Sequence, residues 1–412
     1  MTRPRRRKRR LLPGVPRELR DAPSHAIAVP LPDSLQRFAR TQARWRAGCD
    51  VTVLRDGAET YPAMLAAIRG ALRSIAIETY ILAADGTGDR FKEALAERAR
   101  AGVAVRLIYD AVGSFGLSDA WLDELRALGV EVIDFNPIRM WRRRFRLSYR
   151  DHRKILVVDD AVAFTGGLNI ANDYASVADG GVGWHDMHCR VRGAIVRDLA
   201  RMFRRTWLRS GGTPYTLGTA PAAAPDPPRG RSIVRLIDNT GIRQRTAMRR
   251  AYLHVIKHAE KRVLIQNAYF LPDRGVRRAL ARAARRGVDV RIIVPGRNDV
   301  QLVAWASLYV LRVLARQGIK ILRWPGPMMH AKTAVVDGSW STIGSYNFDA
   351  QSRFNNLEVT VEILDDVVAG ELVRQFDADE PACAPYDEAI WLAQPWWRKA
   401  FAWLAFRLRR FL

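Results

Sequence analysis

A nine-residue pattern occurs twice in the chain, and this duplication constrains the fold more than any other feature. The first copy reads HRKILVVDD (152–160) and the second reads HAKTAVVDG (330–338). In each copy a histidine is followed two residues later by a lysine, then by an apolar run and an aspartate. A glycine-containing turn and an asparagine follow, in TGGLN (165–169) and IGSYN (343–347). Chance does not place these residue types at identical offsets, so we infer an internal duplication.

The apolar run of each copy predicts a buried strand that begins just after two polar residues. Side chains two residues apart on a strand point to the same side. His152 and Lys154 would therefore stand together at one strand end, and so would His330 and Lys332. Adjacent cationic groups repel each other unless an anion lies between them. The pattern therefore predicts an anion-binding site.

The duplication extends well beyond the motif. IETYIL (77–82) matches IQNAYFL (265–271), and AGVAVRLIYD (101–110) matches RGVDVRIIVPG (286–296). Expected strands alternate with expected helices in both halves, which is typical of a parallel or mixed sheet covered by helices. The predicted fold class is α/β, with two duplicated α/β/α sandwich lobes related by a pseudo-twofold and sharing one active site.

Composition indicates where these lobes begin and end. A proline-rich stretch at 213–231 is typical of a linker, and 412 residues exceed the usual size of a single core. A short amphipathic helix is expected around 35–45, and the first strand is expected from Val51. The predicted division consists of a basic arm with a short helix, a first lobe, the linker, a second lobe and a basic amphipathic helix, at 1–46, 47–212, 213–231, 232–385 and 386–412.

Charge and cysteine usage narrow the function classes. The formal net charge of +25 indicates an anionic partner, either a phospholipid surface or a nucleic acid. Three scattered cysteines without CxxC spacing favour neither a disulfide framework nor a structural zinc site. His185, His188 and Cys189 are close in sequence, but their spacing is not that of a standard metal site.

Two convergent His-Lys pairs would suit a phosphate diester. In-line attack at phosphorus needs a nucleophile on one side and a proton donor for the leaving oxygen on the other, and two imidazoles supply both. Four further side chains would hold the non-bridging oxygens and stabilise the charge of the transition state, namely Lys154, Lys332, Asn169 and Asn347. This scheme requires no metal and no cofactor.

The duplicated HxKxxxxD motif, followed by a glycine-containing turn and asparagine, resembles the signature of the phospholipase D superfamily. The similarity covers roughly residues 48–380. The resemblance implies a covalent phosphohistidine intermediate, with His152 as the nucleophile and His330 as the general acid and base. The motif aspartates, Asp159 and Asp337, belong to the same catalytic signature, although in the family they are more often structural partners.

The resemblance also implies residues that orient the histidines. A second carboxylate in each half occupies that place in the family, and here these are Asp186 in WHDMH and Glu358 in NNLE. Ser345 in the second turn is matched by Gly167 in the first. A hydroxyl contact is therefore implied in the second half only.

Within the superfamily the chain is most similar to bacterial cardiolipin synthases of the shorter type without N-terminal spans. The stretches 150–174 and 330–349 carry the resemblance. It implies transfer of a phosphatidyl group from phosphatidylglycerol to the hydroxyl of a second lipid, with release of glycerol. No window holds about 18 uncharged apolar residues, so we expect a peripheral protein at the cytoplasmic face of the bacterial inner membrane.

The C-terminal segment 391–412 is typical of a helix that lies at a membrane surface. A helical wheel places one set of residues on an apolar face, namely Trp397, Phe401, Leu404, Leu408 and Phe411. The opposite face gathers Arg398, Lys399, Arg409 and Arg410. Alternatively, this helix covers the core of the second lobe. The basic residues at 3–10 would add attraction to anionic lipid.

Two other functions fit parts of the sequence. A nuclease of the same superfamily would also cleave a phosphodiester, and the basic charge suits nucleic acid. A non-catalytic membrane-binding protein needs no histidine pair, so the two intact motifs disfavour it. The acceptor lipid, the balance between transfer and hydrolysis, the identity of the nucleophilic histidine and the oligomeric state are left open by the residues.

Overall fold

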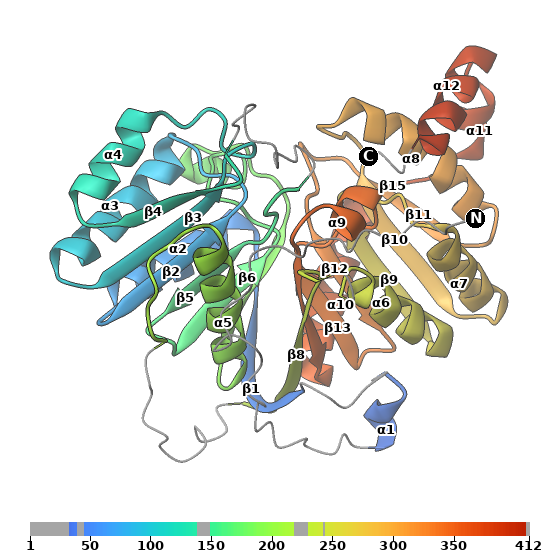
Figure 1. Cartoon of the computed structure of the whole chain (residues 1–412). Helices are drawn as coiled ribbons and strands as arrows, with labels where there is room; N and C mark the ends of the chain where they lie inside the picture. The colour runs from blue at the N-terminus through green and yellow to red at the C-terminus, as the bar shows by residue number, and fades with distance from the viewer. Residues whose placement is uncertain (1–32, 39–44, 138–148, 218–229, 242–243, 409–412) are drawn as a thin grey trace, which may run out of the picture.

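Residues 46–209 form the lobe drawn in blue and green in Figure 1, whereas the short helix near residue 35 packs on the second half. The computed structural model describes residues 33–38, 45–137, 149–217, 230–241 and 244–408. Within these ranges the strands of this half are β1 (Arg46–Arg55), β2 (Ser74–Thr79), β3 (Ala104–Asp110), β4 (Glu131–Phe135), β5 (Ile155–Val158), β6 (Val162–Gly166) and β7 (Met187–Arg192). The helices are α1 (Asp33–Gln36), α2 (Asp56–Arg69), α3 (Gly86–Arg100), α4 (Asp119–Ala127) and α5 (Ile195–Arg209).

The second half repeats this order of elements and continues into two C-terminal helices. Its described strands are β8 (Ser232–Asp238), β9 (Arg262–Asn267), β10 (Asp289–Pro295), β11 (Lys320–Trp324), β12 (Lys332–Val336), β13 (Trp340–Gly344), β14 (Val359–Leu364) and β15 (Ala384–Pro385). Its helices are α6 (Ala247–His258), α7 (Arg274–Arg285), α8 (Gln301–Ala315), α9 (Ala350–Phe354), α10 (Asp366–Asp379), α11 (Glu388–Leu392) and α12 (Trp396–Arg407).

All of these strands belong to one continuous sheet, and its order shows the duplication. The order is β15-β11-β10-β9-β12-β13-β14-β8-β1-β7-β6-β5-β2-β3-β4. Counted outward from the antiparallel β1–β8 contact, the first half runs β1-β7-β6-β5-β2-β3-β4 and the second runs β8-β14-β13-β12-β9-β10-β11. The two halves therefore match strand for strand about a pseudo-twofold between β1 and β8.

Each half combines parallel and antiparallel pairing. β2, β3 and β4 are parallel, as are β9, β10 and β11, while β5 to β7 and β12 to β14 are antiparallel. The helices α3, α4, α7 and α8 lie in the connections between parallel strands, which need a crossover. The predicted α/β class with two duplicated lobes is confirmed.

Three large apolar cores hold the layers together. One core packs α2, α3 and α4 against the outer face of the first half, and a second packs α6, α7 and α8 against the second half. The third contains inner-face residues of both halves together with α5 and α10. Because this shared core joins the halves, the motif strands β5 and β12 are fixed relative to each other.

The start of the first lobe differs from the expectation. We expected a helix around 35–45 and a strand from Val51, but α1 covers only Asp33–Gln36 and β1 already begins at Arg46. The guanidinium of Arg46 pairs with the carboxylate of Asp198 on α5, at 2.7 Å. This tertiary contact favours strand structure in residues whose local sequence gives no strand signal.

The C-terminal segment forms two helices and not one. Pro395 has extended backbone angles and caps the start of α12, so the chain breaks between α11 and α12. Ala402, Ala405 and Phe406 are buried, and the ring of Phe406 lies 4.9 Å from that of Tyr309 on α8. α12 therefore packs on α8 at the outer side of the second lobe, as Figure 1 shows.

The predicted apolar face of this segment stays largely uncovered. We call the exposed residues of this helix end the α12 aromatic patch; it consists of Trp396, Trp397, Phe401, Trp403, Leu404 and Leu408, which are 43–80% exposed. The helix thus covers the second lobe with one face and exposes aromatic residues on another. No helix among the described residues has the length and apolarity needed to cross a membrane.

Several predicted features lie outside the described residues. They are the basic arm at 1–32, residues 39–44, part of the linker at 218–229, and Arg409, Arg410 and Phe411.

Candidate active site

The two motif histidines are buried where the halves meet. His152 is 7% exposed just before β5, and His330 is 4% exposed just before β12. The backbone N–H of His152 donates to the carbonyl of Leu357 at 3.0 Å, and that of His330 donates to the carbonyl of His185 at 2.6 Å. Each motif is therefore joined by its backbone to a segment of the opposite half.

The orienting carboxylates also come from the opposite halves. Nδ1 of His152 lies 3.1 Å from Glu358 Oε2, and Nδ1 of His330 lies 2.7 Å from Asp186 Oδ2. An ionised carboxylate only accepts hydrogen bonds, so each Nδ1 carries the proton in these pairs and Nε2 is left for chemistry. The resemblance placed one carboxylate in each half but did not reveal this exchange.

The motif lysines are buried beside the histidines. Lys154 Nζ donates to the carbonyl of His152 at 2.7 Å, and Lys332 Nζ donates to the carbonyl of His330. Burial lowers the pKa of Lys154 to about 7 and that of Lys332 to about 8, although nearby carboxylates oppose the shift. A phosphate diester in contact would favour the charged ammonium and raise both values.

The histidines respond to the same burial and to these charges. Burial lowers the pKa of His152, and the charge of Lys154 adds to this shift, while Glu358 opposes it. Burial and the charges of Lys332 and Lys154 hold the pKa of His330 well below its usual range. A neutral imidazole suits a nucleophile, and a bound phosphate anion would restore proton affinity to the other ring.

Burial also changes the proton affinity of one orienting carboxylate. It raises the pKa of Asp186 to about 7, although Lys332 and other charged groups lower it. The Cβ of any larger residue at Gly167 would lie 2.1 Å from Asp186 Oδ1. The matching Ser345 instead donates its hydroxyl to Glu358. Gly167 therefore makes room for Asp186, whereas the matching Ser345 binds the other orienting carboxylate, Glu358.

The two motif asparagines have different contacts. Asn169 Oδ1 accepts from the N–H of Ile81 at 3.1 Å, and its Nδ2 donates to the hydroxyl of Tyr174 at 2.6 Å. Asn347 is 2% exposed, and its Oδ1 has no hydrogen-bond partner among the described residues. Asn347 is thus better placed than Asn169 to bind a substrate group.

The motif aspartates bind backbone N–H groups and make no contact with the histidines within the described residues, as expected of structural partners. Asp159 accepts from the N–H groups of Leu72, Arg73 and Ser74, at 2.7–2.8 Å. Asp337 does the same for residues 260–262. Both follow the far ends of their strands, and five strand residues span about 16 Å. These carboxylates fasten the motif strand to its neighbour.

Aromatic side chains surround both histidines, and these contacts could not be predicted from the motifs. The ring of Tyr80 lies 5.0 Å from that of His152, and the rings of Tyr174, Trp184 and Tyr269 lie 5.3, 5.9 and 6.3 Å from that of His330. Tyr80 and Tyr269 both lie in the matching stretches IETYIL and IQNAYFL, although Tyr269 stands one position later. That match was the available signal.

A buried, positively charged side chain lies next to each motif histidine. Arg153 is fully buried in the first motif, and its guanidinium contacts Glu78 at 3.4 Å, Thr206 at 3.1 Å and Thr240 of the other half. Burial raises the pKa of Glu78, and it holds the pKa of Asp151 well above its usual range. Arg153 thus balances two carboxyl groups whose charged forms are costly in the interior.

His185 is the buried cation next to His330, because its backbone carbonyl accepts from the His330 N–H. Its Nδ1 lies 2.7 Å from Asp56 of α2 and its Nε2 lies 3.0 Å from Asp379 of α10, while its ring stacks on Trp324. Although burial lowers its pKa, the two carboxylates raise it to about 9. Within the described ranges no three His, Cys, Asp or Glu side chains are grouped to hold a metal ion.

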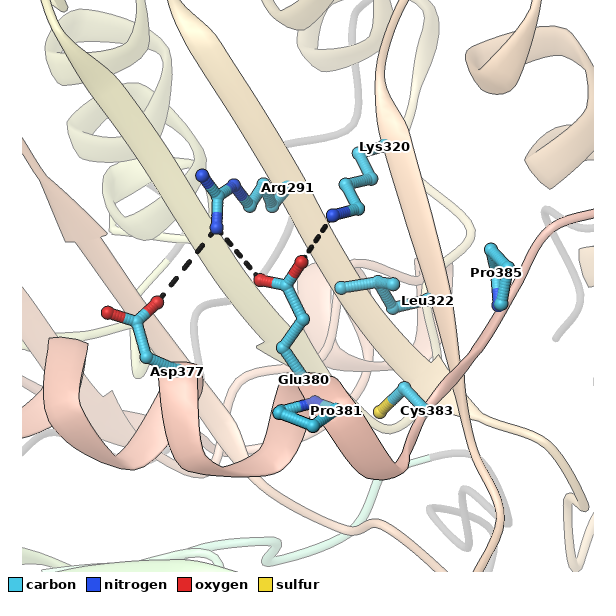
Figure 2. Close-up of a pocket in the computed structure, with 8 residues that line it drawn as sticks. All are labelled: Arg291, Lys320, Leu322, Asp377, Glu380, Pro381, Cys383 and Pro385. Carbon is cyan, nitrogen blue, oxygen red and sulfur yellow. Dashed lines mark hydrogen bonds and ion pairs between the residues drawn. The ribbon is translucent and has the colours of Figure 1, made fainter.

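A separate pocket of about 450 Å³ lies at the end of α10 (Figure 2). Its two cations are paired with carboxylates, because Arg291 contacts Glu380 at 2.8 Å and Lys320 also contacts Glu380. In the histidine site the lysine ammonium groups contact backbone carbonyls instead. The histidine site therefore has the better geometry for a phosphate diester.

Comparisons with known proteins agree with this geometry. The family model described as "Cardiolipin synthase, PLD-like domain" matches residues 64–207 and 252–380, one stretch in each half. The chain is 36% identical over 334 residues to a cardiolipin synthase of Geobacillus kaustophilus, covering 79% of this chain and 65% of the relative. It is 31% identical to the major cardiolipin synthase ClsA of Bacillus subtilis, covering 84% and 72%.

Solved structures share the fold at low sequence identity. A phosphatidylserine synthase from Haemophilus influenzae aligns with a TM-score of 0.59 at 14% identity, covering 82% of this chain and 87% of that one. A polyphosphate kinase from Porphyromonas gingivalis aligns with a TM-score of 0.54 at 15% identity, covering 80% and 46%. The family match and the curated relatives confirm the resemblance inferred from the motifs: the chain belongs to the phospholipase D superfamily, within the cardiolipin synthase family.

Proposed function

We propose that the chain is a phosphatidyltransferase that moves a phosphatidyl group from phosphatidylglycerol to the hydroxyl of a second phospholipid. The observation that carries this proposal is a pair of buried imidazoles, each bound through Nδ1 to a carboxylate of the other half. The names of the curated relatives supply the reaction class. The chain spans about two thirds of the length of the first of these relatives.

In the first step, Nε2 of His152 attacks phosphorus. The bond between phosphorus and the glycerol oxygen breaks, and that oxygen takes a proton from Nε2 of His330. The products are a phosphatidyl group bonded to His152 and free glycerol. Lys154 and Lys332 stabilise the charge on the non-bridging oxygens.

In the second step, the hydroxyl of the acceptor lipid transfers its proton to His330. The acceptor oxygen forms a bond to phosphorus, and the bond between phosphorus and His152 breaks. Glu358 and Asp186 keep the two rings oriented throughout. If the acceptor is phosphatidylglycerol, the product is cardiolipin.

Transfer requires that a lipid hydroxyl reaches the intermediate before water does, so we propose that the site works at a membrane surface. The α12 aromatic patch supports this proposal, because clustered exposed tryptophans favour the bilayer interface. The net charge of +25 favours anionic lipid. We place the protein peripherally, at the cytoplasmic face of the bacterial inner membrane.

The reaction is tested by incubating the protein with vesicles of phosphatidylglycerol, alone or mixed with phosphatidylethanolamine, and identifying the products by mass spectrometry. We expect cardiolipin and glycerol to form. Plasmid DNA serves as the competing substrate in a parallel reaction. DNA cleavage without lipid transfer would replace this proposal with a nuclease activity.

Membrane seating is tested separately by vesicle sedimentation. The double variant Trp397→Glu and Leu404→Glu should bind vesicles at least roughly tenfold more weakly, because it places charge in the interfacial face. Leu72→Glu with Phe115→Glu is the matched control, since both residues are more than 80% exposed on the first lobe. Equal binding by the two double variants would contradict the role of the patch.

A further inference from the structure

Tyr269 and Asp299 form a hydrogen-bonded pair on the His330 side of the site. The Tyr269 hydroxyl lies 2.8 and 2.7 Å from the two carboxylate oxygens of Asp299. The Tyr269 ring stands edge-on to the His330 ring, with centroids 6.3 Å apart. Asp299 is exposed. A phenol ring therefore lies next to the ring that we assign to proton transfer, and its hydroxyl is bonded to an accessible carboxylate.

The loop that carries Asp299 is fixed to the segment that carries Tyr269. Asn298 Nδ2 donates to the carbonyl of Ala268 at 3.3 Å, and Asn298 Oδ1 accepts from the N–H of Val300 at 2.9 Å. These contacts lie on either side of the pair in sequence. They hold the carboxylate in place relative to His330 and reduce the ordering cost of binding a ligand there.

The charge of Asp299 also affects the pKa of groups in both halves. Burial lowers the pKa of Lys332, and Asp299 is among the carboxylates that oppose this shift. Burial raises the pKa of Tyr80 and of Asp173 in the first half, and the charge of Asp299 adds to both shifts. Its carboxylate thus lies within electrostatic range of a motif lysine and of the opposite lobe.

The first half has no such pair among its described residues. Tyr80 lies in the matching stretch of the first half, one position earlier than Tyr269, and its ring packs on His152. The ammonium of Lys154 lies 5.2 Å from the centre of the Tyr80 ring. Hydroxyl recognition is therefore available on the His330 side and is not repeated on the His152 side.

We propose that Tyr269 and Asp299 bind the free hydroxyls of a neutral polyol headgroup, here the glycerol of phosphatidylglycerol. This inference rests on the proposed function. In-line displacement places the departing glycerol and the incoming lipid alcohol opposite His152, on the side of His330. A carboxylate accepts hydrogen bonds from hydroxyl groups, and a phenol can donate or accept one.

Charge favours a polyol over an ammonium headgroup. Asp299 alone would also attract ethanolamine, but Lys332 lies within electrostatic range and repels a second cation. A neutral headgroup with hydroxyls gains the hydrogen bonds without this repulsion. A donor that lacks the hydroxyls leaves the carboxylate without these partners, so the site discriminates against it.

The test compares two donors in vesicles of otherwise equal composition: phosphatidylglycerol and phosphatidylpropanol, whose headgroup lacks free hydroxyls. Headgroup release is measured for the unaltered chain and for Tyr269→Phe, Asp299→Asn and Tyr80→Phe. We expect the unaltered chain to prefer phosphatidylglycerol roughly 10- to 100-fold. The preference should fall to about threefold or less in the two subsite variants, with little change in the rate on phosphatidylpropanol.

The Tyr80→Phe control should keep the donor preference even if both rates change. If Tyr269→Phe loses both rates through misfolding, the exposed Asp299→Asn variant decides the question. Unchanged selectivity in an active Asp299→Asn variant overturns the subsite, and so does a preference of the unaltered chain for phosphatidylethanolamine over phosphatidylglycerol. No turnover of any phosphatidyl donor by the unaltered chain overturns the proposed function and this inference together.

Discussion

The two halves of the active site have the same contacts around the histidines, but the buried cation next to each histidine differs. Both histidines precede a buried strand, are bonded to a carboxylate of the other half and lie beside a buried lysine. Next to His152 the buried cation is Arg153, which keeps its proton at any physiological pH. Next to His330 the buried cation is His185, which can lose its proton. Duplication therefore accounts for the matching histidines and lysines. Later divergence of the neighbouring buried cations made the two halves of the site unequal.

The orienting carboxylates differ in a related way. Glu358 accepts a second hydrogen bond from Ser345, whereas Asp186 lies against Gly167 and has a pKa raised by burial to about 7. A carboxylate that changes protonation near neutral pH suits the side that must give and take a proton. A carboxylate with an added hydroxyl donor suits the side that must keep its ring fixed for attack. We interpret the asymmetry as a division of roles.

The largest effects should come from the histidines themselves. His152→Ala and His330→Ala should each reduce lipid transfer roughly 10⁴-fold or more, because each removes a bond-forming or proton-transferring group. A phosphodiester with a nitrophenol leaving group separates their roles, since nitrophenolate leaves without a proton. His330→Ala should still release a stoichiometric burst of nitrophenolate, and His152→Ala should release none.

The exposed His258→Ala variant is the control for this pair and should keep full activity. Quenching with alkaline denaturant during turnover should trap a phosphatidyl group on His152, because the phosphorus–nitrogen bond survives base and is cleaved by acid. A burst in His152→Ala, with phosphate on His330, would exchange the two roles. Normal lipid transfer by either variant would end the two-histidine mechanism.

The reacting groups could be predicted because they repeat within one chain. The offsets of His152 and His330 are visible without a structure, and the family resemblance added Asp186 and Glu358. The exchange of carboxylates between halves could not be predicted, because it depends on how β1 meets β8. Arg153 could not be assigned either, since its counterpart in the second motif is alanine.

The motif aspartates show that a constant sequence offset does not place a side chain at the same end of a strand as the histidine. The offset of Asp159 from Lys154 is constant in both motifs, yet it places the carboxylate at the far end of β5. Pro395 suits the start of a helix, and it is the N-cap of α12 rather than part of one continuous C-terminal helix. His185 looked like a possible metal ligand, but its partners Asp56 and Asp379 come from distant helices.

Replacing the buried guanidinium should have the largest effect on stability. Arg153→Met leaves Glu78 and Asp151 without their cation, so the free energy of unfolding at pH 7 should fall by about 3–5 kcal/mol. Chemical denaturation measures the change. Arg126→Met breaks an exposed pair with Asp123 and should change it by about 1 kcal/mol or less. Similar losses in both variants would contradict a special role for the buried cation.

Neutralising the orienting carboxylates should separate the two sides of the site. Glu358→Gln and Asp186→Asn should each slow lipid transfer roughly 100-fold or more, because the amide no longer stabilises the ring tautomer that the reaction needs. With the nitrophenyl diester, Glu358→Gln should slow the burst, because it acts on His152. Asp186→Asn should spare the burst and slow later turnover. If Asp186→Asn slowed the burst and Glu358→Gln spared it, each carboxylate would act on the histidine of its own half.

The smallest effect should be a pH dependence that belongs to the His330 side alone. The folded pKa of His185 is raised to about 9, above the ordinary value of about 6.5. Its protonation therefore stabilises the fold fully below about pH 6.5, and this contribution is lost as pH rises through about 9. The shift corresponds to about 3 kcal/mol at most. The groups that face the ring are Asp56, Asp379 and Trp324, with Arg55 bonded to Asp379.

His185→Gln should remove this dependence and leave the Arg153 side unchanged. The variant should be about 2–3 kcal/mol less stable than the unaltered chain at pH 6 and nearly equal to it at pH 10, as measured by urea denaturation across that range. The charge of His185 also lowers the pKa of Asp186, so the activity profile of the variant should shift to higher pH. His258→Gln is the matched control, because it is an exposed histidine of the same half. A stability difference that stayed constant from pH 6 to pH 10 would mean that His185 acts by packing alone. The contrast between Arg153 and His185 would then be one of shape and not of charge.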